Sequence, residues 1–225
     1  INVTPDSSAD GGLRFDPERA VEDGLQMIQD GADILDVGGE SSRPGSTPIS
    51  EDEELRRVLP VIEALAGKLR IPITVDTYRS EIARRCLAAG AQVVNDISAF
   101  RFDPAMASVV AGHKAAVVLM HSRGSREELH TQPPLARGVE QVVEEPGCAV
   151  RSAREAGIAR SAIVVDPGIG FGKRAEESLS VLRNLKAFSP LECALLVGTS
   201  RKSFIKKVAR SDSGAAHSPL WGTAA

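Results

Sequence analysis

Short apolar runs recur along this chain, and almost every run ends in a polar, charged or glycine residue. The runs cover residues 1–3, 33–37, 73–75, 93–94, 117–120, 163–165 and 195–197, and the residues that follow them are Thr4, Gly38, Asp76, Asn95, His121, Asp166 and Gly198. Segments of about a dozen residues or more with helical composition separate the runs, which is the spacing of repeated βα units. Buried parallel strands read as continuous Val, Ile and Leu runs, and polar residues at the carboxyl ends of successive strands are typical of a (β/α)8 barrel enzyme.

We therefore predict an α/β fold, a TIM (β/α)8 barrel, in a single domain that spans residues 1–225. The expected strands are residues 1–4, 33–37, 71–76, 92–96, 115–121, 162–166 and 193–198. A closed barrel needs eight strands and typically about 250 residues. We accordingly expect only seven βα units in a chain clipped at both ends, without the start of the first strand and without the eighth strand and helix.

The helical segments carry start and stop signals. We expect a helix over residues 15–30 with Asp16 as its N-cap, and another that begins at a capping box of Ser50 and Glu53. A proline-glycine pair at 146–147 should split the next long helix in two or kink it sharply, because proline removes a helical hydrogen bond. The other helices are expected at residues 81–89, 103–111, 134–156, 175–188 and 201–209.

Composition excludes several classes of function. Hydrophobic residues make up 42% of the chain and the formal net charge is −3, so a large core is available but no generally basic surface for nucleic acid. Aromatic residues make up 4%, which argues against a platform for base stacking. No apolar run approaches the ~18 residues of a membrane helix, and the cysteines lack close spacing, which indicates reduced thiols. We expect a cytoplasmic protein that contacts neither membrane nor nucleic acid.

Three acids follow apolar runs at the same end of the predicted barrel: Asp76, Asp96 and Asp166. An isolated buried carboxylate is costly, so each must meet hydrogen-bond donors. One of them can cap a helix and another can pair with an arginine. Carboxylates and the Asn95 amide around one cavity also suit a flat heterocycle rich in N–H groups, and we favour that interpretation.

Loops at the same strand ends are candidate anion sites. The turn-forming residues after Asn2 fit a surface turn or an anion or metal loop. In residues 38–45, paired glycines and Arg43 fit phosphate or carboxylate binding and a solvated loop equally well. In residues 198–205, free N–H groups at a helix start meet cationic and hydroxyl side chains, which favours an anion site over a merely capped helix.

Other motifs are absent. Residues 166–173 are rich in glycine but match neither a Walker motif nor a dinucleotide fingerprint, so we expect a loop over the cavity floor. The histidines show no metal-ligand spacing, so a zinc site is not expected. The chain also lacks G-x-S-x-G, the nucleophile motif of α/β-hydrolases.

The chain resembles the dihydropteroate synthase family in seven ordered blocks. These are NVTPDS at residues 2–7, GGESSRPG at 38–45, VDTY at 75–78, NDI at 95–97, MH at 120–121, DPGIGFGK at 166–173 and SRKSFI at 200–205. The resemblance implies a TIM-barrel transferase of folate biosynthesis, a target of sulfonamides. Such an enzyme joins p-aminobenzoate to a dihydropterin carrying a methyl diphosphate and releases pyrophosphate with Mg²⁺.

The resemblance also implies roles for particular residues. The pterin would be held by Asp76, Asn95, Asp166, Lys202, Met120 and Phe171. Asp76, Asp166 and Lys202 would be catalytic, and Asn2 would belong to the Mg²⁺–diphosphate site. The p-aminobenzoate site would include Ser42, Arg43 and Pro44 on a mobile second loop, together with Ser8 and Ser203.

Three departures from the family pattern matter. Ser8 stands where the family usually has Phe, so we expect weaker binding of p-aminobenzoate and sulfonamides. The pair at 146–147 interrupts a helix that is usually continuous. The eighth strand is absent together with its diphosphate-binding Arg-x-His, so we expect the 225-residue chain alone to be inactive or barely active, and the complete protein to be an active homodimer.

Two alternatives stay open at this point. One is a pterin-dependent methyltransferase of the same superfamily, acting on methyltetrahydrofolate, although such an enzyme is not expected to carry the Ser-Arg-Lys-Ser segment. The other is a pterin-binding fragment or paralogue without catalysis, which the missing strand and Ser8 favour.

Overall fold

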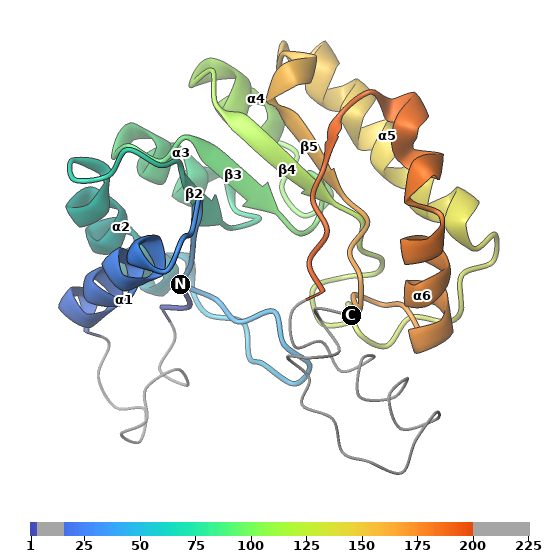
Figure 1. Ribbon diagram of the computed structural model, residues 1–225, viewed down its shortest axis with the longest axis horizontal. Helices are drawn as coiled ribbons and strands as arrows, with labels where there is room; N and C mark the ends of the chain where they lie inside the picture. Colours follow the sequence, from blue (N-terminus) through green and yellow to red (C-terminus); the bar gives the residue numbers. More distant parts are fainter. Residues whose placement is uncertain (4–15, 200–225) are drawn as a thin grey trace.

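The computed structural model describes residues 1–3 and 16–199, and these form one parallel β-sheet with helices along its outer side (Figure 1). The strands are β1 (Leu35–Gly38), β2 (Ile73–Asp76), β3 (Val93–Asp96), β4 (Ala116–Met120), β5 (Ile163–Asp166) and β6 (Ala194–Leu195). Each strand pairs in parallel with the next one along the sequence, so their order in the sheet is β1 to β6.

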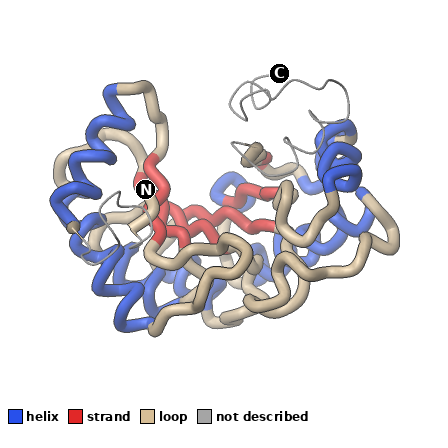
Figure 2. Tube along the Cα trace, turned by 90° about the horizontal axis from the view of Figure 1, so that it is seen from below, coloured by secondary structure: helices blue, strands red, loops and turns tan. Residues whose placement is uncertain are grey.

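The helices alternate with these strands. They are α1 (Pro17–Gln29), α2 (Glu51–Ala66), α3 (Ser80–Ala88), α4 (Met106–Gly112), α5 (Val139–Glu155) and α6 (Ala175–Arg183), with two 3-10 helices, η2 (Arg160–Ala162) and η3 (Leu185–Leu191). Figure 2 shows the strands as an arc enclosed by helices, which is the arrangement of successive βα units in a barrel. In this part of the chain, no helix is both long enough and apolar enough to cross a bilayer.

The predicted first and last strands are shorter than expected. Asn2 forms an isolated parallel bridge with Gly38. Val3 N donates to Gly38 O at 2.8 Å, and Gly38 N donates to Ile1 O at 3.0 Å. The strand predicted at 1–4 is therefore a single bridge beside β1 in the described residues, and the strand predicted at 193–198 is reduced to β6.

The two faces of the sheet have different characters, because successive side chains of a strand point to opposite faces. The face toward the helices is apolar, and its residues Val37, Val75, Val94, Val117, Leu119 and Val165 are at most 1% exposed. They belong to one core with helix residues such as Ile62, Ile82, Met106, Val110 and Val142. The residues in between point to the concave face and include acids and an amide.

Local signals set the starts of α1 and α2. Asp16 Oδ1 accepts hydrogen bonds from two N–H groups of the first turn of α1 at 3.0 and 3.4 Å, as the sequence predicts. Pro17 takes the first helical position, where a missing N–H costs nothing. Ser50 Oγ accepts from Glu53 N at 3.2 Å, but the Glu53 carboxylate pairs with two arginines of its own helix. Only half of the predicted capping box is therefore present.

Helix α5 runs unbroken through Pro146 and Gly147, so the expected division into two helical pieces is wrong. Proline removes one backbone hydrogen bond, and the remaining turns of a 17-residue helix on the core hold it together. A Cβ on Gly147 would lie 3.2 Å from Leu191 Cδ2, so the glycine lets η3 pack closely against α5.

Helix α6 ends earlier than the predicted 175–188. Asn184 leaves the helical region with φ −118° and ψ 29°, and its Nδ2 donates to Ser180 O at 2.8 Å. This side-chain bond satisfies a terminal carbonyl that would otherwise need another helical turn. The chain continues as the tighter helix η3.

Candidate functional site

The carboxyl ends of the strands bring four predicted pterin residues to one edge of the sheet. Asp76 on β2 lies opposite Asn95 on β3, and Met120 on β4 lies opposite Asp166 on β5. Because side chains alternate along each strand, all four point toward the concave face. Of the two other predicted pterin residues, Phe171 lies in the loop after β5, and Lys202 lies outside the described residues, as do Ser8 and Ser203.

Asp36 of β1 joins this cluster, although the sequence analysis does not single it out. Asn95 Nδ2 donates to Asp36 Oδ2 at 3.2 Å. Burial raises the pKa of Asp76 well above its usual range, and the negative charge of Asp36 raises it further. Solvent reaches the Asp36 side chain, yet the protein surrounds it closely enough that desolvation raises its pKa as well, against the Asn95 hydrogen bond. Both acids would therefore be stabilised in their charged forms by a ligand that donates hydrogen bonds.

Gly38 makes room for Asp76. A Cβ at Gly38 would lie 3.2 Å from both Cβ and Oδ2 of Asp76, which is tighter than ordinary van der Waals contact. A side chain opposite Asp76 on β1 would therefore push the Asp76 side chain by a few tenths of an ångström. This gives a steric reason for the first glycine of the Gly-Gly pair that follows the β1 run.

Asp166 and Lys173 shape the glycine-rich loop after β5. Gly168 N donates to Asp166 Oδ1 at 2.7 Å. Lys173 Nζ donates to Gly168 O at 2.9 Å and to His121 O and Phe171 O at 3.3 Å each, which ties the loop to the end of β4. Gly168 has a φ of +65°, and a Cβ there would overlap the His121 carbonyl oxygen. The glycine and the lysine thus hold a compact turn beside the acids.

Met120 and Phe171 provide an apolar wall next to the acids. Both belong to a small cluster with Ile97 and Leu129, separate from the main core. The ring of His130 lies 5.5 Å from that of Phe171, centroid to centroid. A flat ring that meets the carboxylates on its edge would have apolar side chains beside its face.

The predicted p-aminobenzoate loop, residues 39–49, is held by a cluster of charges that the sequence analysis misses. Glu40 Oε1 accepts from Arg126 Nε at 2.8 Å and from Tyr78 OH at 3.0 Å, and Oε2 accepts from Arg79 Nη2 at 3.2 Å. Arg79 also pairs with Glu54 of α2. Burial and then the Glu40 charge raise the pKa of Tyr78 to about 12. Glu40 therefore joins loops that follow β1, β2 and β4.

Further contacts fix the backbone of the same loop. Arg126 Nη2 donates to Ser41 O at 2.5 Å, and His130 Nε2 lies 2.7 Å from Ser42 O. The side chains of Arg43 and Pro44 are exposed. The loop thus has a fastened base at 40–42 and an open tip at 43–45.

Asp96 has a structural role. Its side chain is fully buried. Its Oδ1 accepts from Ser98 N at 2.8 Å and from Ser98 Oγ at 2.7 Å, and Oδ2 accepts from Phe100 N at 2.7 Å. These bonds close the turn between β3 and α4. Of the three acids at the strand ends, only Asp76 and Asp166 face the concave side.

Asn2 lies at the same edge, beside Gly38 and exposed to solvent. Within residues 1–3 and 16–199, no group of three or more His, Cys, Asp or Glu side chains could hold a metal by themselves. A Mg²⁺ ion bound to a diphosphate needs fewer protein ligands, because substrate oxygens and water complete its octahedron. One amide oxygen at this position fits that donor set.

Comparisons with known proteins agree with this geometry. A family model described as "Pterin binding enzyme" matches residues 1–225. The dihydropteroate synthase of Synechocystis is 42% identical over 225 residues, which covers 100% of this chain and 77% of that relative. The dihydropteroate synthase of Xanthomonas albilineans, solved with 4-aminobenzoic acid, superposes with a TM-score of 0.88 at 38% identity, over 100% of this chain and 78% of that one. The same enzyme in complex with 7,8-dihydropteroate gives a TM-score of 0.84 at 36% identity, over 100% and 78% of the two chains.

Proposed function

Because this chain belongs to the dihydropteroate synthase family of pterin-binding enzymes, we propose that the polar edge of its sheet is the pterin site. The chain is a transferase of that family. It condenses (7,8-dihydropterin-6-yl)methyl diphosphate with p-aminobenzoate to give 7,8-dihydropteroate and pyrophosphate. The observation that carries the site assignment is the convergence of Asp76, Asn95 and Asp166 on one edge of the sheet, beside Met120 and Phe171.

The pterin has amino and ring N–H groups on one edge and a carbonyl group. Asp76 and Asp166 would accept hydrogen bonds from the N–H groups, and Asn95 can donate and accept. Lys202 would donate to the carbonyl. The raised pKa of Asp76 supports this assignment, because a carboxylate whose charge is disfavoured by burial gains most from a partner with several donors.

The condensation requires little acid–base chemistry from the protein. The C–O bond to diphosphate breaks, the pterin spreads the developing positive charge over its ring, and the arylamine nitrogen forms the new C–N bond and loses a proton. Fixed carboxylates beside the ring stabilise that charge, and loops that exclude water protect the cation from hydrolysis. This agrees with a site without a histidine-centred dyad.

We propose that Asn2 contributes its amide oxygen to Mg²⁺ at the diphosphate. The ion, when bound, neutralises charge on the leaving pyrophosphate. The position of Asn2 at the sheet edge, next to Gly38 and hence to Asp76, supports a diphosphate placed on that side of the pterin.

The p-aminobenzoate loop is assigned to residues 39–49, with Ser42, Arg43 and Pro44 at or near its tip. The fastened base positions the tip, and the exposed guanidinium of Arg43 is available to a carboxylate. Ser8 and Ser203 would complete this pocket. We also propose that the enzyme is cytoplasmic and forms a homodimer.

The related proteins reported above are synthases, which does not favour the methyltransferase or the non-catalytic alternative. Calorimetry with the pterin diphosphate and Mg²⁺, followed by a pyrophosphate-release assay, tests the assignment in the complete protein. Asp166→Asn keeps an oxygen for Gly168 N but loses the charge, and it should weaken pterin binding by roughly 10- to 100-fold. Asp52→Asn, on the exposed first turn of α2, is the matched control and should bind as the parent does. Equal affinity in both variants would refute the site, and binding without turnover would favour the non-catalytic alternative.

A further inference from the structure

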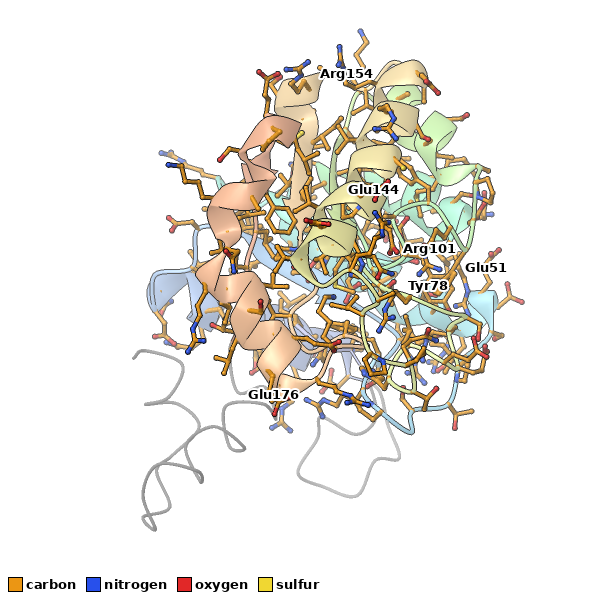
Figure 3. All side chains as sticks on the ribbon, turned by 90° about the vertical axis from the view of Figure 1, so that its right-hand side faces the viewer. Glu51, Tyr78, Arg101, Glu144, Arg154 and Glu176 are labelled. Carbon is orange, nitrogen blue, oxygen red and sulfur yellow. The ribbon has the colours of Figure 1, made fainter. Side chains whose placement is uncertain are left out.

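A cleft lies between α4 and α5, and of the described residues assigned to the pterin only Met120 borders it. Its volume is about 780 Å³, within the range of small-molecule sites. Its walls come from the loop after β3, from α4, from residues 120–124 and from α5. Figure 3 looks onto this side of the molecule, with Arg101 beside the first half of α5.

Buried polar atoms without partners gather in this cleft. In the described part of the chain, three buried side-chain atoms of residues that line it have no hydrogen-bond partner: His121 Nδ1, Arg123 Nε and Gln141 Oε1. His121 is 2% exposed. Its Nε2 lies 2.9 Å from Glu145 Oε2, so Nδ1 is the ring nitrogen that lacks a partner. Such atoms destabilise the fold unless a bound molecule satisfies them.

The cleft also has an excess of positive charge. Arg101 donates to Gly124 O at 2.9 Å and to Ser122 Oγ at 2.8 Å, and Arg123 donates to Pro133 O at 2.6 Å and Gly172 O at 2.7 Å. Neither guanidinium has a carboxylate within ion-pair distance among the residues that the structure describes. Glu145 is the acid on the cleft wall. His121 is neutral at pH 7, because burial lowers its pKa to about 4.

The remaining walls are apolar. Phe100, Pro104, Ala107, Ala149 and the proline of α5 line the space between the helices. Ala99 and Phe100 hold left-handed backbone conformations with φ of 50° and 70°, which strains the loop where it borders the cleft. A ligand that fits must therefore combine an apolar body with a group that accepts hydrogen bonds from cations.

We propose that the cleft between α4 and α5 binds a small carboxylate with an apolar body, at a site that borders the pterin edge and shares Met120 with it. The carboxylate would lie among Arg101, Arg123 and His121, and the body would pack on Phe100 and Ala149. The occupancy of the site is measured without an activity assay.

Cys148 offers a local probe of occupancy, because it is exposed and lines the cleft. The thiol first loses its proton to water, and the thiolate then displaces iodide from iodoacetamide and forms a thioether. Cys86 is buried with its pKa raised to about 12, and burial raises the pKa of Cys193, so both should react more slowly. The rate at Cys148 is read from its peptide by mass spectrometry.

The probe ligand is 4-phenylbutanoate, with its neutral amide 4-phenylbutanamide as control. At ten times its Kd the acid should slow labelling of Cys148 in the full chain roughly tenfold, because only the empty fraction reacts, and should leave Cys193 unchanged. The amide should protect much less. Calorimetry supplies the Kd.

Two variants localise the effect. Ser152→Trp, at an exposed position of α5 that lines the cleft, should fill it and abolish binding. Arg123→Gln should weaken binding roughly tenfold, while Arg154→Gln, which changes an exposed arginine of α5 outside the cleft, should not. Absence of both heat and protection at millimolar acid would overturn the proposal and leave a cleft filled by water alone. Equal protection by acid and amide would overturn the carboxylate assignment, even if Arg123→Gln failed to fold.

Discussion

Asp76 is a residue at which stability and activity should oppose each other. The pKa of Asp76 is raised in the folded protein, so the unfolded state gives up the proton more easily. The free energy of unfolding therefore decreases as the pH rises from 3.8, the pKa in the unfolded chain, through the pKa in the folded protein. The asparagine variant cannot ionise. We expect Asp76→Asn to unfold at higher urea concentration than the parent at pH 8, with a difference that shrinks toward pH 4, and to lose turnover by roughly 100-fold.

Urea unfolding at several pH values and the pyrophosphate assay measure the two effects. The control is Asp52→Asn, which should change neither. If the parent were more stable than Asp76→Asn at pH 8, burial of the Asp76 carboxylate would not lower the free energy of unfolding.

At the scale of elements, Glu40 and Arg126 connect a loop to the rest of the barrel. Arg126→Met keeps the side-chain stem but loses the bonds to Glu40 and Ser41. Because the base of the loop would then be free to move, we expect the KM for p-aminobenzoate to rise roughly tenfold with a smaller change in kcat. Steady-state kinetics measure the KM. The control is Arg84→Met, which changes an exposed arginine of α3 and should keep the parental KM. A parental KM in Arg126→Met as well would contradict this role of Arg126.

Helix α5 carries a proline at a position where an alanine would complete its hydrogen bonds. Pro146→Ala should raise the free energy of unfolding by about 1–2 kcal/mol, because the recovered helical bond outweighs the greater freedom of the unfolded chain. Pro17→Ala is the control, since the first helical position needs no N–H, and it should bring no gain. Equal midpoints in urea for Pro146→Ala and the parent would show that α5 has already adapted to the proline.

Which elements could be predicted from sequence depends on the range of the interactions that fix them. The start of α1 rests on Asp16 and the next three residues, so a local pattern identifies it. The position of the acids at the strand ends can be predicted because side chains alternate along each strand and the carboxyl ends of parallel strands meet at one edge of the sheet. By contrast, Glu40 and Arg126 are 86 positions apart and Asn95 and Asp36 are 59 apart, and no local pattern indicates which partner each one meets. The unbroken α5 depends on its packing against η3, which the pair at 146–147 does not reveal.

At the scale of the whole molecule, buried His121 and its neighbour Glu145 should govern the loss of stability in acid. The pKa of His121 falls from 6.5 to about 4 on folding, so the unfolded state binds the proton more tightly and stability decreases as the pH falls from 6.5 to 4. The full shift corresponds to about 3 kcal/mol at most. Contact with His121 lowers the pKa of Glu145 to about 2, so its contribution is lost as the pH falls from 4.5 toward 2.

His121→Phe should flatten the curve of unfolding free energy between pH 6.5 and 4, measured by urea titration. His113→Phe, at an exposed position after α4, should leave that curve as it is. A parental slope in His121→Phe would show that other groups control this range.

The alternation of side chains along the strands also means that the core and the chemistry share one alignment. Val75 and Asp76 are neighbours, yet one is sealed among the helices and the other meets the substrate side. A shift of β2 by a single position would turn the Asp76 carboxylate toward the apolar core and the Val75 side chain toward the concave face. A chain misaligned in this way would become prone to aggregation and would lose turnover at the same time. Cellular quality control that removes aggregation-prone chains would therefore also remove inactive ones.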